Sequence, residues 1–318
     1  MVIEILTTGA LNSVQDTGRF GYLNLGVAQS GAMDATALAV GNLVLGNDPA
    51  CAALEVAMYP FKLRFTKEQT FAVVGAHCQI TLGERVVPPQ WVCHAKAGDT
   101  LVLQPPSVGV RSYVCFAGGL DVQLVMGSRS TDLKSALGGL EGRGLRRGDT
   151  IDVYQSAAFE FSGGVCAPTS VVTGEAEIRV TAASEYSEFS DEELRRFFTS
   201  KWTVTQESNR MGIRLAGPTI APRQKMEMLS HGILPGTVQV PPAGQPIVQM
   251  ADANTCGGYP KIANVIDVDI ARLAQLAVGS TFRFVEVTHD QALQAQIQLD
   301  DELYRLRRVV GTAYKKLV

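Results

Sequence analysis

The stretch QDTGRFGYLNLG, residues 15–26, returns in altered form as QESNRMGIRLAG at residues 206–217. The glutamine, the arginine and two glycines are identical, and an acid followed by a hydroxyl stands after the glutamine in both copies. Each copy looks like a loop that enters a strand. Matching segments precede and follow the two copies in the same order, which predicts two domains of related fold. These segments are Ile3-Glu4-Ile5 with Ile178-Arg179-Val180, and Gly98-Asp99-Thr100 with Gly279-Ser280-Thr281.

A recurrent turn indicates that both domains are rich in β-strands. It appears as AGDTLVL (97–103), RGDTIDV (147–153) and VGSTFRF (278–284), where a glycine permits a positive φ and a β-branched run follows. The fold class is therefore expected to be mainly β with a few helices. We expect a β-rich domain at 1–170, a second at 171–290 and a helical tail at 291–318.

Three helices are expected between the strands. The first covers 35–45 after Asp34 as N-cap, and the second follows Ser190, with Glu193 in the capping-box position. The third covers about 290–310, where apolar residues recur near helical spacing and arginines gather toward the end. Docking on its own domain is favoured for this last helix over binding of a partner.

Composition excludes several classes of function. The net charge of −3 gives no electrostatic footprint for nucleic acid, and no apolar run approaches the roughly 18 residues of a membrane span. The first ten residues lack the pattern of a signal peptide, so we expect a cytoplasmic protein. The six cysteines form no C-x-x-C pair. Zinc at His77-Cys78 and Cys93-His94 is disfavoured, because strand neighbours point to opposite faces.

The strongest candidate site is the loop ADANTCGGYPKIANV, residues 251–265, which follows an apolar run. A carboxylate, a hydroxyl and an ammonium within ten residues can orient an amide and move protons, and paired glycines let backbone approach a ligand. A polar turn with a surface lysine is the alternative. We expect Asp252, Thr255 and Lys261 to be catalytic, and Asn254, Gly257, Gly258 and Tyr259 to bind substrate.

A second candidate lies in MGSRSTDLKSALGGLEGRGLRRGD, residues 126–149. Ser128, Arg129 and Ser130 precede a possible short helix at 132–137, and hydroxyls at a helix start suit an anion that an arginine can clamp. We expect these three residues to contribute to substrate binding. For the arginine-rich part, an anion site, a contact between protein chains and a solvated loop remain open.

The repeated phrase itself is more typical of a structural corner than of a catalytic site. In the first copy Asp16 can cap backbone N–H groups while Arg19 braces it. For Arg210 in the second copy a role in substrate binding is equally open. His231 lies in a turn-rich loop of the same half, and we expect it to bind substrate, with capping of the loop as the alternative. The sequence contains no Walker-A loop, no dinucleotide fingerprint, no nucleophile elbow and no H-E-x-x-H, and we expect no metal site.

Four segments resemble the biotin-dependent carboxyltransferase, or allophanate hydrolase subunit 2, family, and the resemblance extends over about residues 1–290. Within this family the chain is most similar to the C subunit of 5-oxoprolinase. The segments are VQDTGRFGYLNLGVAQSGAMD, GSRSTDLKSALGGLEGRGLRRGD, ESNRMGIRLAGP and ADANTCGGYPKIANVIDVD.

The resemblance implies two cyclophilin-like β-barrel domains and an enzyme that works with partner subunits. One expected partner is like allophanate hydrolase subunit 1, which corresponds to the B subunit of 5-oxoprolinase. A third component is lactam-hydrolase-like and corresponds to the A subunit of 5-oxoprolinase. The implied reaction opens 5-oxo-L-proline to L-glutamate with ATP, which we expect a partner to bind or help to bind. Lys261 would polarise the carbonyl while Asp252 holds the N–H.

Two other functions remain open from the resemblance. One is a biotin-dependent carboxyltransferase component acting on urea or a similar amide, and the other is a non-catalytic antagonist of a partner inhibitor protein. Biotin is expected only if the chain is a carboxyltransferase component, and then carried by another protein. The order Lys225-Met226-Glu227-Met228 does not place a lysine between two methionines, as a biotinyl site requires.

Overall fold

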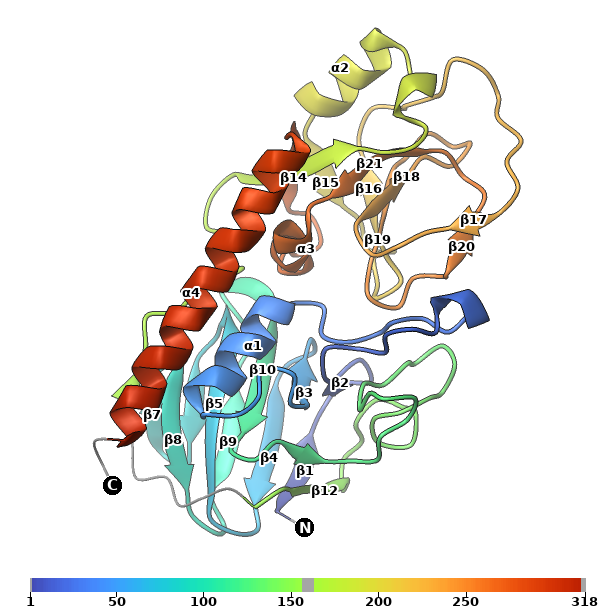
Figure 1. The fold of residues 1–318 in the computed structure, drawn as a ribbon. Helices are drawn as coiled ribbons and strands as arrows, with labels where there is room; N and C mark the ends of the chain where they lie inside the picture. Colours follow the sequence, from blue (N-terminus) through green and yellow to red (C-terminus); the bar gives the residue numbers. More distant parts are fainter. Residues whose placement is uncertain (1, 156–162, 316–318) are drawn as a thin grey trace. The chain divides into compact units, whose positions relative to one another are not determined.

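The computed structural model describes residues 2–155 and 163–315 and divides the chain into two compact units. The first contains residues 1–19, 30–171 and 299–318, and the second contains 20–29 and 172–298. The predicted mainly β fold is confirmed, since strands make up most of the ordered elements of both units (Figure 1). The domain bounds drawn from the sequence stay a prediction, and their residues 1, 156–162 and 316–318 lie outside the described residues.

The first unit is built on two sheets around a shared apolar core. One has the order β11-β12-β1-β4-β9-β6-β7 and the other β13-β8-β5-β10-β3-β2. Fully buried Phe61, Phe71 and Leu101 are among the residues that form the core. The strands are β1 Ile3–Thr7, β2 Ser13–Gln15, β3 Ala53–Val56, β4 Phe61–Phe65, β5 Gln69–His77, β6 Ile80–Leu82, β7 Arg85–Val87, β8 Trp91–Ala95, β9 Thr100–Leu103, β10 Val108–Phe116, β11 Leu120–Asp121, β12 Thr150–Val153 and β13 Gly163–Gly164.

Helix α1 (Ala35–Val44) packs against β5 and β10 and buries eight of its residues. Asp34 is its N-cap and accepts from the Ala37 N–H at 2.8 Å, as predicted. Helix α4 (His289–Lys315) confirms the predicted tail helix, and its Leu306 and Val310 are buried in the same apolar cluster as α1. Docking of these two side chains on the first unit agrees with the expected role of the tail.

The second unit is a closed barrel with the order β14-β21-β18-β19-β16-β15-β22. All neighbours are antiparallel except β14 and β22, which run parallel. Phe197, Trp202 and Phe284 pack together, and the rings of Phe197 and Phe284 stack 4.6 Å apart. The strands are β14 Ala176–Ala182, β15 Trp202–Val204, β16 Gly212–Ala216, β17 His231–Gly232, β18 Thr237–Gln239, β19 Ile247–Gln249, β20 Cys256–Gly257, β21 Lys261–Val265 and β22 Thr281–Glu286.

Short helices complete the second unit. Helix α2 (Asp191–Thr199) begins at the predicted N-cap, because the Ser190 hydroxyl accepts from the Glu193 N–H at 3.3 Å. Helix α3 (Asp267–Ala274) carries Asp269, which is fully buried and accepts two hydrogen bonds from the Arg179 guanidinium. The remaining elements are the 3-10 turns η1 Leu23–Leu25 and η2 Tyr186–Glu188.

The three predicted turns share one geometry. Gly98, Gly148 and Gly279 have φ of 94°, 88° and 85°, values that glycine adopts without steric cost. Each glycine N–H donates to a carbonyl of a neighbouring strand, and β9, β12 and β22 begin two residues later. The two copies of the twelve-residue phrase differ more. The second enters β16 as predicted, whereas the first forms η1, so the expected strand there was wrong.

Among the described helices, none is long and apolar enough to cross a membrane. The cytoplasmic location stays a prediction.

Candidate functional site

The predicted polar loop begins with a buried ion pair at the ends of β16 and β19. Asp252 accepts from Arg210 Nε at 2.8 Å and from Nη2 at 3.0 Å, and both side chains are less than a tenth exposed. The Asp252 N–H also donates to the Arg210 carbonyl at 2.9 Å. This bidentate geometry fixes both side chains. The Asp252 carboxylate therefore accepts two hydrogen bonds from Arg210. It could contact a substrate directly only through its remaining lone pairs.

Lys261 is the first residue of β21 and lies beside Glu185, which precedes η2. Its Nζ is 3.8 Å from Glu185 Oε2, and the two side chains are 13% and 15% exposed. The same carboxylate oxygen accepts from the Lys261 backbone N–H at 3.0 Å. A charge-assisted hydrogen bond of this type is about 2.7–2.9 Å long. The ammonium thus has a carboxylate close by and still has donors for a ligand oxygen.

Two glutamines line the barrel surface next to this lysine. Gln239 pairs in register with Lys261, and Gln249 Nε2 donates to Gln239 Oε1 at 3.0 Å. Their strand neighbours Val238 and Val248 are fully buried, so the two glutamines point to the opposite face. Both are nonetheless less than a tenth exposed. The polar loop contacts the first of them, since Gln239 Nε2 donates to the Tyr259 carbonyl at 3.4 Å.

The small ladder of β17 and β20 forms part of this cover and brings His231 opposite Gly257. A Cβ on Gly257 would lie 2.7 Å from Gln239 Nε2, so the backbone here lies close to the end of the Gln239 side chain. His231 Nδ1 contacts the Leu229 carbonyl at 3.0 Å. Its Nε2 is buried and has no hydrogen-bond partner among the described residues. A buried polar atom of this kind is uncommon unless a ligand or water completes it.

The other predicted residues surround the ladder. The Thr255 carbonyl accepts from the Ile233 N–H at 3.1 Å, and a Cβ on Gly258 would lie 3.0 Å from the Met228 carbonyl. Asn254 is exposed, and Tyr259 is 45% exposed. The loop and the segment around His231 therefore lie side by side. The sequence indicated only that both belong to the second half of the chain.

Sequence reasoning missed Glu185, Gln239 and Gln249. Glu185 is 76 positions from Lys261 in the chain, and its only sequence signal was its place in the segment inserted before the second copy of the repeat. Gln239 lies in the apolar run TVQV, where a buried polar residue at a strand end is a detectable but weak signal.

The second candidate segment has a different structure from the predicted one. The helix expected at 132–137 is wrong. Asp132 instead closes a turn by bridging to Leu137, and its side chain accepts from the Lys134 and Ser135 N–H groups. Such local bonds compete with a helix.

The anion bound by Ser128, Arg129 and Ser130 is a carboxylate of the chain itself, that of Asp16. The Asp16 carboxylate accepts from the Ser128 hydroxyl at 2.6 Å, the Ser130 hydroxyl at 2.5 Å and the Arg129 N–H at 2.5 Å. Arg19 donates to the Ser130 carbonyl. The Arg129 guanidinium lies over the Tyr154 ring, 5.4 Å from its centroid. A substrate role for the three residues stays a prediction that this geometry does not favour.

The Asp16→Ala variant is expected to lower the free energy of unfolding of the first unit by about 3 kcal/mol or more, because several buried donors lose their acceptor. Denaturant unfolding followed by Trp91 fluorescence, in a Trp202→Phe background, measures this. The Asp121→Ala variant, at an exposed position of the same unit, is the control and should change stability little. Equal stability of the two variants would contradict the structural role of Asp16.

Comparison with known proteins identifies the family. The model of the carboxyltransferase domain, subdomain A and B, matches residues 25–286. The chain belongs to this carboxyltransferase domain family. The chain is 42% identical to the C subunit of 5-oxoprolinase from Escherichia coli, over 93% of its own length and 94% of the relative's. It is 39% identical to the C subunit of 5-oxoprolinase from Haemophilus influenzae, over 97% and 99% of the two chains. The family resemblance seen in the sequence is confirmed.

The fold of the chain is also that of a solved relative. The structure of K. lactis urea amidolyase superposes with a TM-score of 0.88 at 29% identity. The match covers 96% of this chain but 20% of that protein, so the chain spans about a fifth of the length of urea amidolyase. The likeness supports the observed domain fold. It does not transfer the activity of the whole urea amidolyase to this chain.

Within the part of the chain that the structure describes, no three His, Cys, Asp or Glu side chains are grouped to hold a metal ion.

Proposed function

We propose that the chain is one component of an ATP-dependent 5-oxoprolinase, an enzyme that converts 5-oxo-L-proline, ATP and water to L-glutamate, ADP and phosphate. Identities of 42% and 39% over nearly full length to the C subunits of two 5-oxoprolinases support this choice. The polar site on the barrel of the second unit is where we place the lactam.

The observation that carries the proposal is the state of Lys261. Its side chain is largely buried, and a carboxylate oxygen of Glu185 is 3.8 Å from its ammonium. An ammonium held in this way can donate to a carbonyl oxygen that becomes negative as the carbonyl is attacked. The buried His231 Nε2 offers a further polar contact on the same loop cluster.

In the proposed reaction the lactam, or a phosphorylated form of it, binds with its amide oxygen toward Lys261. Addition of water to the carbonyl carbon of the lactam places negative charge on that oxygen, and the C–N bond of the ring then breaks. Where the oxygen already carries the phosphoryl group of ATP, the same ring opening leaves an acyl phosphate, which a second water hydrolyses to glutamate and phosphate. The leaving nitrogen takes a proton and becomes the amino group of glutamate. Glu185 holds the Lys261 backbone and balances its charge, and the Arg210–Asp252 pair fixes the start of the loop.

We place ATP binding on or with a partner protein. In the site described above, Arg210 is bound to Asp252 and Lys261 faces Glu185, so neither cation forms part of a phosphate cradle. The sequence also lacks a Walker-A loop. The proposed partners resemble the B and A subunits of 5-oxoprolinase, and without them we expect the chain to be inactive.

Reconstitution tests the proposal. The chain is mixed with its candidate B-like and A-like partners, 5-oxo-L-proline and ATP, and glutamate is measured. We expect glutamate only when all three proteins and ATP are present. Assembly of the folded proteins without glutamate formation would overturn the proposal.

The likeness to urea amidolyase favours one other candidate, carboxyl transfer to an amide. Both substrates present an amide-like carbonyl and nitrogen, so the same loop would serve either. Transfer of a carboxyl group from a separate carboxybiotin protein to urea, measured with labelled bicarbonate, distinguishes this function from lactam opening.

A further inference from the structure

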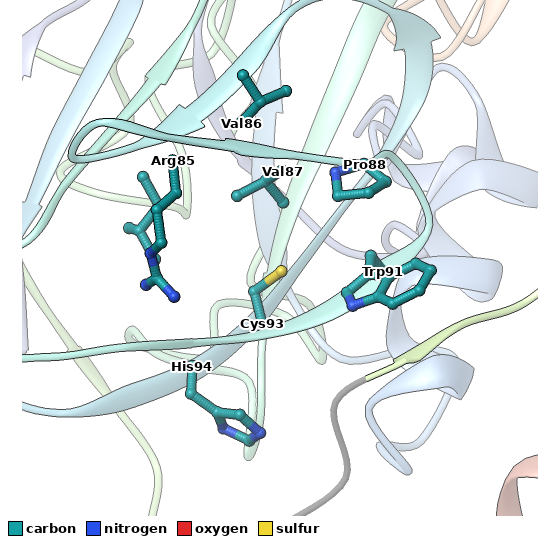
Figure 2. A pocket seen from close by; sticks show the side chains of 8 residues that line it. Arg85, Val86, Val87, Pro88, Trp91, Cys93 and His94 are labelled. Carbon is teal, nitrogen blue, oxygen red and sulfur yellow. The ribbon is translucent and has the colours of Figure 1, made fainter.

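The first unit contains a recess that the proposed reaction does not use. It lies between β7 and β8, has a volume of about 210 Å³ and is lined by residues of the first unit alone (Figure 2). Drug-sized ligands occupy pockets of roughly 300–1,000 Å³, so this recess suits a smaller molecule. Its lining residues are Leu82, Arg85, Val86, Val87, Pro88, Trp91, Cys93 and His94.

One side of the recess is rigid. The connection from β7 to β8 contains Pro88 and Pro89, followed by Gln90 in the left-handed region at φ 56°. Gln90 is held by its N–H, which donates to the Val73 carbonyl at 2.8 Å. The indole of Trp91 packs against the backbone of Gly164, where a Cβ would lie 2.3 Å from the ring. The aromatic wall is therefore fixed before any ligand arrives.

The floor of the recess is apolar and uncharged. Leu82 and Val87 are buried, and the Cys93 thiol points toward Val87 and Pro88 (Figure 2). Burial raises the pKa of Cys93 to about 11, with Arg85 opposing the rise, so the thiol is neutral at pH 7. His94 turns its ring away from the recess, and its Nδ1 contacts Thr70 Oγ1 at 2.8 Å.

Arg85 supplies the charge at this recess. Its side chain descends from β7 toward β8 (Figure 2), and among the described residues its guanidinium has no hydrogen-bonded or ion-paired partner. A guanidinium presents a planar set of donors that matches a carboxylate. At the other side of the recess (Figure 2), the Trp91 indole offers a ring face or edge of the kind that packs on flat molecules.

We propose that this recess is a binding site for a small monocarboxylate with a flat ring. The carboxylate binds Arg85, and the ring lies over the apolar floor against Trp91. This assignment does not rest on the proposed lactam reaction, because its residues and its charge belong to the first unit.

Trp91 provides the reporter for the test. The chain has two tryptophans, of which Trp202 is fully buried and Trp91 is 37% exposed. The whole chain is titrated with 5-oxo-L-proline, a flat-ring monocarboxylate, and with 2-pyrrolidinone, the same ring without the carboxylate. We expect a saturable change in fluorescence with 5-oxo-L-proline, absent from the Trp91→Phe variant, and much weaker binding of 2-pyrrolidinone.

Matched variants test the role of the charge. Arg85→Gln is expected to weaken binding about tenfold or more, the usual effect of losing a charge-assisted hydrogen bond. Arg147→Gln, at another exposed arginine of this unit, should bind as the unmodified chain does, and so should Lys261→Ala. Thermal melting checks that each variant is folded. The proposal is overturned if 5-oxo-L-proline gives no saturable change, if the change persists in Trp91→Phe, or if folded Arg85→Gln binds with undiminished affinity.

Discussion

The Lys261→Ala variant should form glutamate about 100- to 1,000-fold more slowly than the unmodified chain in the reconstituted complex, the loss typical of removing one donor to a developing oxyanion. The Lys261 side chain is 13% exposed, and its ammonium is 3.8 Å from a carboxylate oxygen of Glu185. This distance is longer than that of a hydrogen-bonded ion pair, so the ammonium can still donate to a substrate oxygen. Deleting it removes a charge from the site. The loss should appear mainly in kcat, because the developing charge exists in the transition state.

Lys201→Ala is the matched control for this variant. Lys201 is 53% exposed in the same unit and forms a surface ion pair with Glu175, so its removal should leave the rate unchanged. Assembly of each variant with the partner proteins is checked by size-exclusion chromatography. If assembled Lys261→Ala turns over at the full rate, Lys261 does not touch the reacting carbonyl, and the site must be sought elsewhere.

Local signals in the sequence were sufficient for most elements of the fold. The turns at Gly98, Gly148 and Gly279 were predicted because a glycine, a capping side chain and a β-branched run occur within a few residues. Ser190 and Asp34 were recognised as caps for the same reason. The helix expected at 132–137 failed because the Asp132 side chain binds nearby backbone N–H groups and closes a turn.

The site was less predictable because its contacts are distant in the chain. The pairing of Arg210 with Asp252 joins residues 42 positions apart, and Glu185 meets Lys261 across 76. The sequence placed Asp252 and Lys261 in one loop, but it did not indicate which charges are paired. Likewise, hydroxyls at Ser128 and Ser130 suggested an anion, and only the fold identifies the Asp16 carboxylate as the one they hold.

The Arg210→Ala variant should lower the free energy of unfolding of the second unit by about 3–5 kcal/mol, because it leaves the Asp252 carboxylate buried without its bidentate partner. Asp252→Ala should have an effect of similar size. For a unit of this length, a loss of that size corresponds to a decrease in Tm of roughly 10–17 °C. Trp202 lies in the barrel, so denaturant unfolding in a Trp91→Phe background reports on this unit alone.

Two further variants separate the pair's charge from its packing. The double variant Arg210→Met, Asp252→Leu fills the same space without charge and should recover much of the lost stability, since an apolar pair can replace a buried ion pair at little cost. Glu192→Ala removes a surface pair with Arg196 and should cost about 0.5 kcal/mol at most. A folded double variant that is stable but inactive would show that the pair positions the loop for catalysis. If Arg210→Ala or Asp252→Ala is no less stable than Glu192→Ala, the pair does not hold the loop. In that case the remaining charge would have moved into water instead of staying buried without a partner.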